Sequence, residues 1–329
     1  MPENTAYTVI VVTHNHVDTL PACLDAAAAL DPPAHEVLVI DNASTDGSAD
    51  VAAARSDKAV RLIRETTNTG FAAAVNRGLR ETTAEWILLL NPDCAPRRDF
   101  VARMLEAARE TPEFNEIGAI TGRLIRSKDA ALEPGGILDA AGMVVTSSGR
   151  HFDRGAGEPD DGRYSRPAWV FGGTGAATLY RRSAFEDVAY PDGQVFAESF
   201  FAYREDAELA WRLQWRGWSC RYEPEAVAVH RRGLRPEEGR AGRWEVNRHS
   251  VRNRFLLRAH CGDLGWHLGC FPRWLLRDLL VVAACLTVER SSLPALAEAW
   301  RMRRDARARR GWVLGRALAP SGEVRRWFG

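Results

Sequence analysis

The 329-residue chain is poor in cysteine, and no two of its six cysteines are spaced as CxxC. The scattered thiols therefore predict neither a zinc site nor a disulfide framework. The first residues hold no basic segment followed by an apolar run, so we expect no secretory signal peptide. These two absences favour a reducing, cytoplasmic compartment.

Two nucleotide-binding signatures are also missing. The chain contains neither GxGxxG nor GxxxxGK[ST], which removes the main support for a nicotinamide-binding domain and for a phosphate-loop nucleotidase. Long hydrophobic runs are absent as well. The longest uncharged stretch in the apolar segment near the C-terminus, Leu279–Val288, has ten residues, about half of what a membrane-spanning helix needs.

Charge is balanced overall but unevenly distributed. The net charge is +1, so composition indicates no nucleic-acid partner. Residues 248–329, however, contain 16 arginines, no lysine and six acidic residues, a net charge of +10 that leaves −9 on the first 247 residues. A basic tail of this kind predicts contact with an anionic surface, the alternative being a solvated helical face.

The first hundred residues alternate between apolar strands and helical segments, as in a mostly parallel α/β sheet. Strands are predicted at Thr8–Thr13, Val37–Ile40, Val60–Arg64 and Trp86–Leu90, and helices at Val17–Ala29, Ser48–Arg55 and Phe71–Arg80. Polar residues follow three of these strands, namely Thr13-His14-Asn15, Asp41-Asn42 and Asn91-Pro92-Asp93. Ligands bind at the carboxyl edge of open α/β sheets, so we expect a site there.

The second half is less regular. Gly135–Asp161 is rich in glycine and aspartate and predicts an ordered loop or a mobile flap. Strand character returns at Val170–Tyr180, and Ala202–Gly217 predicts a helix. Beyond residue 258, the apolar, arginine-flanked segment suits either a membrane interface or helices packed on the main domain, or a dimer contact.

Four groups of residues are candidates for chemistry. Gly70 begins a predicted helix, where a close backbone approach favours an anion. Asp93 places a carboxylate at the expected crevice, although a lone aspartate in a turn is commonly a turn residue. Glu205 and Asp206 begin a helix after an aromatic segment that can bury a carboxylate and raise its pKa; the helix dipole alone also favours acids there. His230 follows a strand and is a candidate metal ligand.

Together, in this order, the segments TVIVVTHN, VLVIDNASTDGS, NTGFAAAVNRGL, ILLLNPDC, FGGTGAATLYRR and FFAYREDAELAWRLQWRGW resemble the family 2 inverting glycosyltransferases of the GT-A fold, especially bacterial rhamnosyltransferase-like members. The resemblance covers about residues 7–258. It implies an α/β GT-A domain over 1–258, with a nucleotide-binding half to about 112 and an acceptor half from about 113. Residues 259–329 form a basic amphipathic helical tail.

The resemblance also assigns roles. Asp206, with Glu205, would supply the general base, and Asp93 and His230 would bind a divalent metal, Mg²⁺ or Mn²⁺. Asn91 replaces the first aspartate of the family's metal motif, so its own coordination of metal is in doubt. The residues expected to bind the nucleotide sugar are Thr13, Asn15, Asp41, Asn68, Gly70, Asn76, Asn91, Gly172 and Gly173.

The implied reaction is transfer of a sugar with inversion, best matched by L-rhamnose from dTDP-β-L-rhamnose. The acceptor would be a saccharide or a polyprenyl-diphosphate-linked saccharide in cell-wall or surface polysaccharide synthesis. A UDP-hexose or UDP-galactofuranose donor is one alternative, and a non-catalytic sugar-nucleotide-binding protein is another. We expect a peripheral protein at the inner face of the membrane. A homodimer is a separate option for its assembly.

Overall fold

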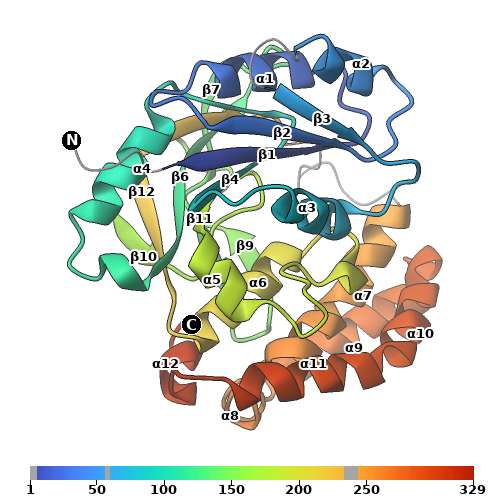
Figure 1. Ribbon diagram of the computed structural model, residues 1–329. Coiled ribbons are helices and arrows are strands. Elements are labelled where there is room, and N and C mark those ends of the chain that lie inside the picture. Colours follow the sequence, from blue (N-terminus) through green and yellow to red (C-terminus); the bar gives the residue numbers. More distant parts are fainter. Residues whose placement is uncertain (1–5, 56–59, 233–243) are drawn as a thin grey trace.

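The computed structural model describes residues 6–55, 60–232 and 244–329. Its centre is a ten-stranded sheet with the main order β10-β12-β6-β11-β4-β1-β2-β3, and β5 and β7 pair at its side (Figure 1). The strands are β1 (Tyr7–Thr13), β2 (Glu36–Asp41), β3 (Val60–Arg64), β4 (Trp86–Leu90), β5 (Cys94–Pro96), β6 (Ile117–Ser127), β7 (Pro134–Ala140), β10 (Ala168–Val170), β11 (Ala177–Arg181) and β12 (Ser219–His230). Two further strands, β8 (Met143–Val145) and β9 (His151–Asp153), form a separate hairpin.

Helices cover both faces of the sheet. The helices of the main domain are α1 (Leu20–Ala28), α2 (Ser48–Ala53), α3 (Phe71–Arg80), α4 (Phe100–Arg109), α5 (Arg182–Val188) and α6 (Glu205–Trp215). Six more follow, namely α7 (Trp244–Cys261), α8 (Leu264–Gly269), α9 (Arg273–Leu286), α10 (Leu293–Arg301), α11 (Arg303–Gly315) and α12 (Ser321–Arg325). In Figure 1 the helices α1 and α2 lie above the sheet, α3 and α5 lie below it, and the last helices form a further layer underneath.

The predicted α/β organisation of the first hundred residues is confirmed. Strands β1, β2, β3 and β4 are parallel neighbours, with Val9 opposite Val37 and Leu88. All seven residues of β1 are buried, because helices pack on both sides of it. A continuous run of β-branched residues is the pattern that such a doubly covered strand requires.

The prediction of a loop over Gly135–Asp161 is wrong. This segment contains β7, which pairs antiparallel with β6, and the β8–β9 hairpin. Strands β8 and β9 have three residues each, and β7 begins with a proline and two glycines, so neither a long apolar run nor regular alternation marks them in the sequence.

The strand predicted over Val170–Tyr180 is instead two strands. Strand β10 ends at Val170 and β11 begins at Ala177, with a glycine-containing turn between them. Strand β11 is antiparallel to both β4 and β6, so it joins the parallel N-terminal half to the parallel pair β6–β12. The turn before β11 thereby reaches the edge where β4 ends.

The C-terminal helices pack on the catalytic half through a large apolar cluster. Trp211 of α6 contacts Trp266 and Phe328, with ring centroids 5.4 Å and 4.6 Å apart. The sequence left packing of the tail on the main domain as an alternative, and this packing is what the structure shows. The expected domain boundary at residue 258 falls inside α7.

Within the described residues, no single helix is long and apolar enough to cross a bilayer. Helix α9 and the segment Arg290–Arg301 pass such a test of length and composition only as a pair, and that pair is bent by 109°.

Candidate active site

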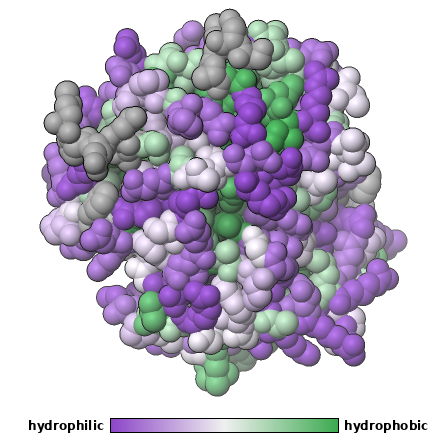
Figure 2. Space-filling view, viewed as in Figure 1, coloured by the Kyte–Doolittle hydropathy of each residue, from purple (hydrophilic) through white to green (hydrophobic). Residues whose placement is uncertain are grey.

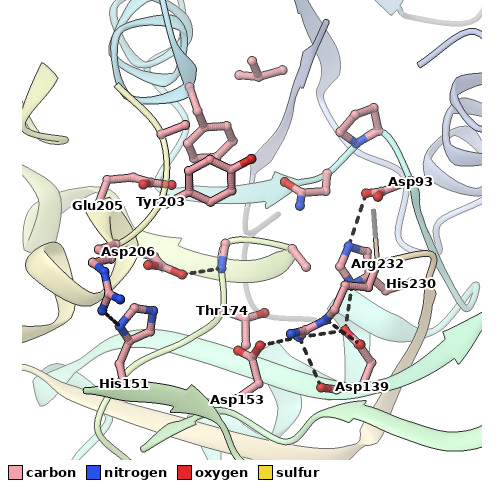
Figure 3. Close-up of a pocket in the computed structure, with 18 of the residues that line it drawn as sticks. Asp93, Asp139, His151, Asp153, Thr174, Tyr203, Glu205, Asp206, His230 and Arg232 are labelled. Atoms are coloured by element: carbon pink, nitrogen blue, oxygen red, sulfur yellow. Dashed lines mark hydrogen bonds and ion pairs between the residues drawn. The ribbon is translucent and has the colours of Figure 1, made fainter. Parts of the chain in front are cut away.

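A cavity of about 520 Å³ opens at the carboxyl edge of β1 and β4 and extends to the start of α6. Five residues that the sequence singled out line it together: Asn91, Asp93, Glu205, Asp206 and His230. Figure 3 shows them in two groups, with Glu205 and Asp206 on one side of the cavity and Asp93 and His230 on the other. The expected convergence of these distant segments is therefore what the fold produces.

Strand pairing brings Asp93 to His230. Strand β5 runs antiparallel to β12 with Cys94 opposite His230, and the Arg231 N–H donates to the Asp93 carbonyl at 2.8 Å. The His230 Nε2 atom lies 3.2 Å from Asp93 Oδ1, and Nδ1 lies 2.7 Å from Asp139 Oδ2. Burial lowers the pKa of His230, but the two carboxylates outweigh it and raise the pKa to about 10.

Asp139 and Arg232 extend this group across the cavity floor (Figure 3). Arg232 Nε donates to Asp139 Oδ1 at 2.9 Å, and the same guanidinium pairs with Asp153. Burial alone would raise the pKa of Asp139, yet His230 and Arg232 lower it to about 2. Asp139 thus stays ionised between two cations.

The opposite side carries a buried acid, Glu205, and a half-buried acid, Asp206. The Asp206 carboxylate accepts the Gly175 N–H at 3.2 Å and the Ala207 N–H at 2.7 Å. Burial, and then the charge of Asp153, raise the pKa of Asp206 to about 6. Burial and the neighbouring Asp206 raise the pKa of Glu205 well above its ordinary value. The pKa of each acid is thus raised, that of Glu205 by burial and by the charge of Asp206 beside it.

A strained turn presents these acids. Phe201, Tyr203 and Arg204 all have positive φ, at 64°, 71° and 74°. The turn is fastened by α7, because Asn253 Nδ2 lies within hydrogen-bond distance of the carbonyls of residues 200, 202 and 203, at 2.7–2.9 Å. Strain of this kind persists only where the surroundings hold it, so α7 is part of the site's framework.

The expected nucleotide-binding residues lie around the cavity, and several are its immediate chain neighbours. Thr13 and Asp41 are adjacent across β1 and β2, and each has a buried side-chain oxygen without a hydrogen-bond partner among the described residues. Unsatisfied buried oxygens at a sheet edge leave capacity for a polar ligand. The Asn15 side chain instead accepts the Thr45 N–H at 2.8 Å, so it holds the turn that follows β2.

Asn68 and Gly70 are held by hydrogen bonds from Asn42, just past the end of β2. Asn42 Nδ2 donates to Asn68 Oδ1 at 3.0 Å and to the Gly70 carbonyl at 3.2 Å. Gly70 has a φ of 86°, and a Cβ there would lie 2.5 Å from the Phe201 ring. Glycine is thus required where the start of α3 meets the strained turn.

Three expected ligand-binding residues face protein instead. The Asn76 side chain donates to the carbonyl of residue 196 and accepts N–H groups from residues 195 and 196, which fixes the loop before α6. A Cβ on Gly172 would lie 2.4 Å from Ala210, and one on Gly173 would lie 2.3 Å from Thr178. None of the three lines this cavity, and their part in ligand binding stays a prediction.

The sequence of this chain is similar to those of known proteins. Residues 8–189 match the profile described as Glycosyl transferase family 2, which is more than half of the chain. The chain belongs to glycosyl transferase family 2. It is also 30% identical over 315 residues to the N-acetylglucosaminyl-diphospho-decaprenol L-rhamnosyltransferase of Mycobacterium tuberculosis, covering 87% of this chain and 93% of the relative.

Other relatives are more distant. A poly-beta-1,6-N-acetyl-D-glucosamine synthase of Staphylococcus aureus is 24% identical over 226 residues, 67% of this chain and 48% of the relative. The structure of the mannosyltransferase PcManGT from Pyrobaculum calidifontis, in complex with GDP-Man and Mn²⁺, matches with a TM-score of 0.55 at 21% identity, over 96% of this chain and 86% of that one. S. aureus TarS 1-349 with UDP-GlcNAc matches with a TM-score of 0.53 at 15% identity, over 94% and 89%. The glycosyltransferase therefore has the GT-A fold.

The donor set of this glycosyltransferase fits a cation only in part. Among the described residues no group of three or more histidine, cysteine, aspartate or glutamate side chains could hold a metal. Asp93 and His230 nevertheless face each other at the cavity wall. The other ring nitrogen of His230, Nδ1, lies 2.7 Å from the Asp139 carboxylate. A carboxylate behind a histidine is the usual support of a ligating imidazole, and Mg²⁺ sites commonly combine one or two protein ligands with substrate phosphates. The pair fits a cation whose remaining ligands come from a diphosphate, provided that the cation displaces the proton between His230 Nε2 and Asp93.

Sequence reasoning missed four residues of this site: Asp139, His151, Asp153 and Arg232. Asp139, His151 and Asp153 lie on β7 and β9, inside the segment predicted to be a loop, and Arg232 follows β12. In the sequence only charge marks the two aspartates: LDAA and HFDR place Asp139 and Asp153 as isolated acids beside apolar residues. Pairing of β7 with β6 places Asp139, the β8–β9 hairpin carries His151 and Asp153, and Arg232 follows the end of β12.

Proposed function

We propose that this glycosyltransferase transfers a sugar with inversion, in a single displacement, using Asp206 as the base. The observation that carries the proposal is the Asp206 carboxylate, half-buried on the cavity wall with its pKa raised to about 6. A base with a pKa slightly below the working pH is both ionised and basic enough to accept a proton. Burial and the adjacent Asp206 raise the pKa of Glu205, which disfavours a second negative charge beside the base.

In the proposed reaction an acceptor hydroxyl oxygen attacks the anomeric carbon, and its proton passes to Asp206. The bond from that carbon to the diphosphate breaks on the opposite side, and the nucleoside diphosphate leaves with the electron pair. The Gly175 and Ala207 N–H groups hold the Asp206 carboxylate in place for this step. Attack and departure on opposite faces invert the configuration.

Asp93 and His230 would hold a divalent cation, Mg²⁺ or Mn²⁺, on the leaving-group side. When bound, that cation would neutralise charge on the diphosphate. Asp139 fixes the ring orientation of His230, and Arg232 offsets the charge of Asp139 and Asp153.

We further propose L-rhamnose, from dTDP-β-L-rhamnose, as the transferred sugar and a lipid-linked saccharide as the acceptor. Support comes from the mycobacterial relative, whose name specifies rhamnosyl transfer to a diphospho-decaprenol-linked sugar, and which matches over nearly its whole length. A UDP-hexose or UDP-galactofuranose is the competing donor, since sugar choice depends on few pocket contacts.

The test combines a donor panel with one variant. Thermal shifts with dTDP-rhamnose, UDP-hexoses and UDP-galactofuranose, each with Mg²⁺ or Mn²⁺, should single out the true donor, because a bound ligand raises the apparent melting temperature. Asp206→Asn should lower kcat by about 10²- to 10⁴-fold while the donor-induced shift remains. Unchanged turnover in this variant would remove Asp206 as the base, and a panel without any shift would contradict the donor assignment.

A further inference from the structure

Helix α9 exposes its apolar side to solvent. Leu276, Leu279, Leu280 and Leu286 are 54–61% exposed and recur at helical spacing, whereas Asp278 and Cys285 on the other side face α7. This reverses the ordinary arrangement, in which a surface helix turns its apolar stripe inward. We call these four leucines the α9 stripe. Its exposure indicates an apolar ligand or surface.

The preceding turn continues this apolar surface. Leu264 and Leu268 of α8 are 73% and 69% exposed, and Phe271 between α8 and α9 is 54% exposed. Figure 2 shows hydrophobic colour protruding at the lower end of the molecule, where Figure 1 places α8.

An arginine cluster lies between α9 and the hairpin β8–β9. Its members are Arg150, Arg254, Arg258 and Arg277, and Asp278 is the one carboxylate paired with any of them among the described residues. Arg254 and Arg258 share Asp278, while Arg150 and Arg277 have no ion pair in the described part of the chain. Four guanidinium groups against one carboxylate leave a local charge of +3.

This excess charge is partly buried and incompletely satisfied. Arg254 and Arg258 are 3% and 5% exposed, and Arg258 Nη1 and Arg277 Nε are buried without a hydrogen-bond partner in the described residues. Burial lowers the pKa of Arg254 to about 10, with the charges of Arg258 and Arg277 adding to this effect and Asp278 opposing it. Buried cations without counter-charges are costly, so an anionic ligand would stabilise them.

The cluster also adjoins the active-site cavity. Ser250 lines the cavity, and Arg254 and Arg258 follow it at successive turns of α7. Arg254 donates to the Ser148 carbonyl in the β8–β9 turn, and Arg150 directly precedes the cavity residue His151. The arginine cluster therefore lies beside the cavity wall that Ser250 and His151 form, and Asp278 connects it to α9.

We propose that the arginine cluster binds the diphosphate of a prenyl-diphosphate-linked acceptor, whose prenyl chain lies on the α9 stripe. Guanidinium groups bind phosphate oxygens through paired charge-assisted hydrogen bonds, and a diphosphate supplies the negative charge that the cluster lacks. This inference rests on the proposed function, because it places the acceptor's sugar in the cavity beside Asp206.

The test measures binding of farnesyl diphosphate to the full chain by calorimetry, with excess dTDP and Mg²⁺ to fill the donor site. Arg150→Gln/Arg277→Gln should weaken binding by about tenfold or more, since two charged contacts are lost. Neither arginine has an ion pair within residues 6–55, 60–232 and 244–329, so their removal strands no carboxylate there. Arg290→Gln is the matched control, an exposed arginine just beyond α9, and should bind like the unaltered protein.

Three results would overturn the assignment. Equal binding by the double variant and the unaltered protein would exclude the arginines. Inorganic pyrophosphate binding as tightly as farnesyl diphosphate would exclude the prenyl part. If Arg290→Gln weakens farnesyl diphosphate binding as much as the double variant does, and both variants lose equal binding to phosphatidylglycerol vesicles, the effect is one of general surface charge only.

Binding without turnover separates this inference from the function. If the double variant loses farnesyl diphosphate while the unaltered protein transfers no sugar, the site stands and the proposed reaction fails. If sugar transfer to a prenyl-diphosphate acceptor proceeds with the same KM in both proteins, the reaction stands and the site fails.

Discussion

Asp206 shows how one residue acquires its chemistry from its surroundings. It begins α6 directly after the strained turn, and burial together with the charge of Asp153 raises its pKa to about 6. The same side chain in water would be a much weaker base. Its position at the cavity wall makes that difference usable.

A pH profile follows from this value. Because the base must be ionised, kcat/KM should fall about tenfold per pH unit below about pH 6 and level off above it. Initial rates at low donor and acceptor concentrations measure this limb. In Asp153→Asn the limb should move to lower pH, since one of the charges that raise the Asp206 pKa is gone; an unmoved limb would contradict the electrostatic account.

At the residue scale the sequence predicted the acids and the histidine but not their partners. Asp93, Asp206 and His230 each adjoin a recognisable motif, so local pattern was sufficient. Asp139 and Asp153 lie in short strands without such a pattern, and only strand pairing brings them to His230 and Arg232. Asn76 was expected to touch ligand because its motif suggested it, yet its amide holds residues 195 and 196.

At the scale of elements, α7 connects the tail to the catalytic turn. Asn253→Asp keeps the size of the side chain but replaces the amide N–H donors with a carboxylate that faces three carbonyls. We expect kcat to fall by about 10- to 100-fold, because small displacements of a catalytic group are costly, while the donor dissociation constant stays the same.

The control for this variant is Arg248→Ala. Arg248 lies on α7, like Asn253, and pairs with Glu298 of α10. This control should leave kcat within about twofold. A proportional loss of donor binding in Asn253→Asp would indicate general unfolding of the site instead of displacement of Asp206.

The α9 stripe makes a second prediction at this scale. Leu279→Gln/Leu280→Gln should reduce cosedimentation with anionic vesicles by about tenfold, because each exposed leucine contributes roughly 1 kcal/mol when it enters an apolar phase. The folded protein should lose little stability, since both side chains already face water. Leu318→Gln, at an equally exposed leucine beyond α11, should bind vesicles normally; a monomer–dimer change in the double variant would instead identify the stripe as a contact between copies.

Elements were predicted unequally well for a physical reason. Strands β1 and β4 are buried on both faces, so their apolar runs are long and unmistakable. Strands β8 and β9 have only three residues each, and the first four residues of β7 are not buried, so no apolar run or regular alternation marks these strands. The tail's composition allowed a membrane interface or packing on the domain, and composition alone cannot tell which side of a helix faces inward.

On the scale of the whole molecule, the tail and the GT-A domain share one core. Phe328 is 7% exposed and packs against Phe171 and Trp211, with ring centroids 5.7 Å and 4.6 Å apart. Phe328→Ala should therefore lower the free energy of unfolding by about 3 kcal/mol. Denaturant unfolding followed by tryptophan fluorescence measures this loss. An unchanged midpoint would mean that the last helix contributes nothing to the domain's stability.

Asp139 sets a rule for anyone who redesigns the donor pocket. It is the shared counterion of His230 and Arg232, so replacing it alone would leave two adjacent cations repelling each other behind Asp93. Single-site libraries at this position would mostly return damaged proteins, and productive variants would need coordinated changes at two or three of these positions. His230, Asp139, Arg232 and Asp153 at the floor of the pocket therefore depend on one another, and a change at one of them calls for a matching change at another.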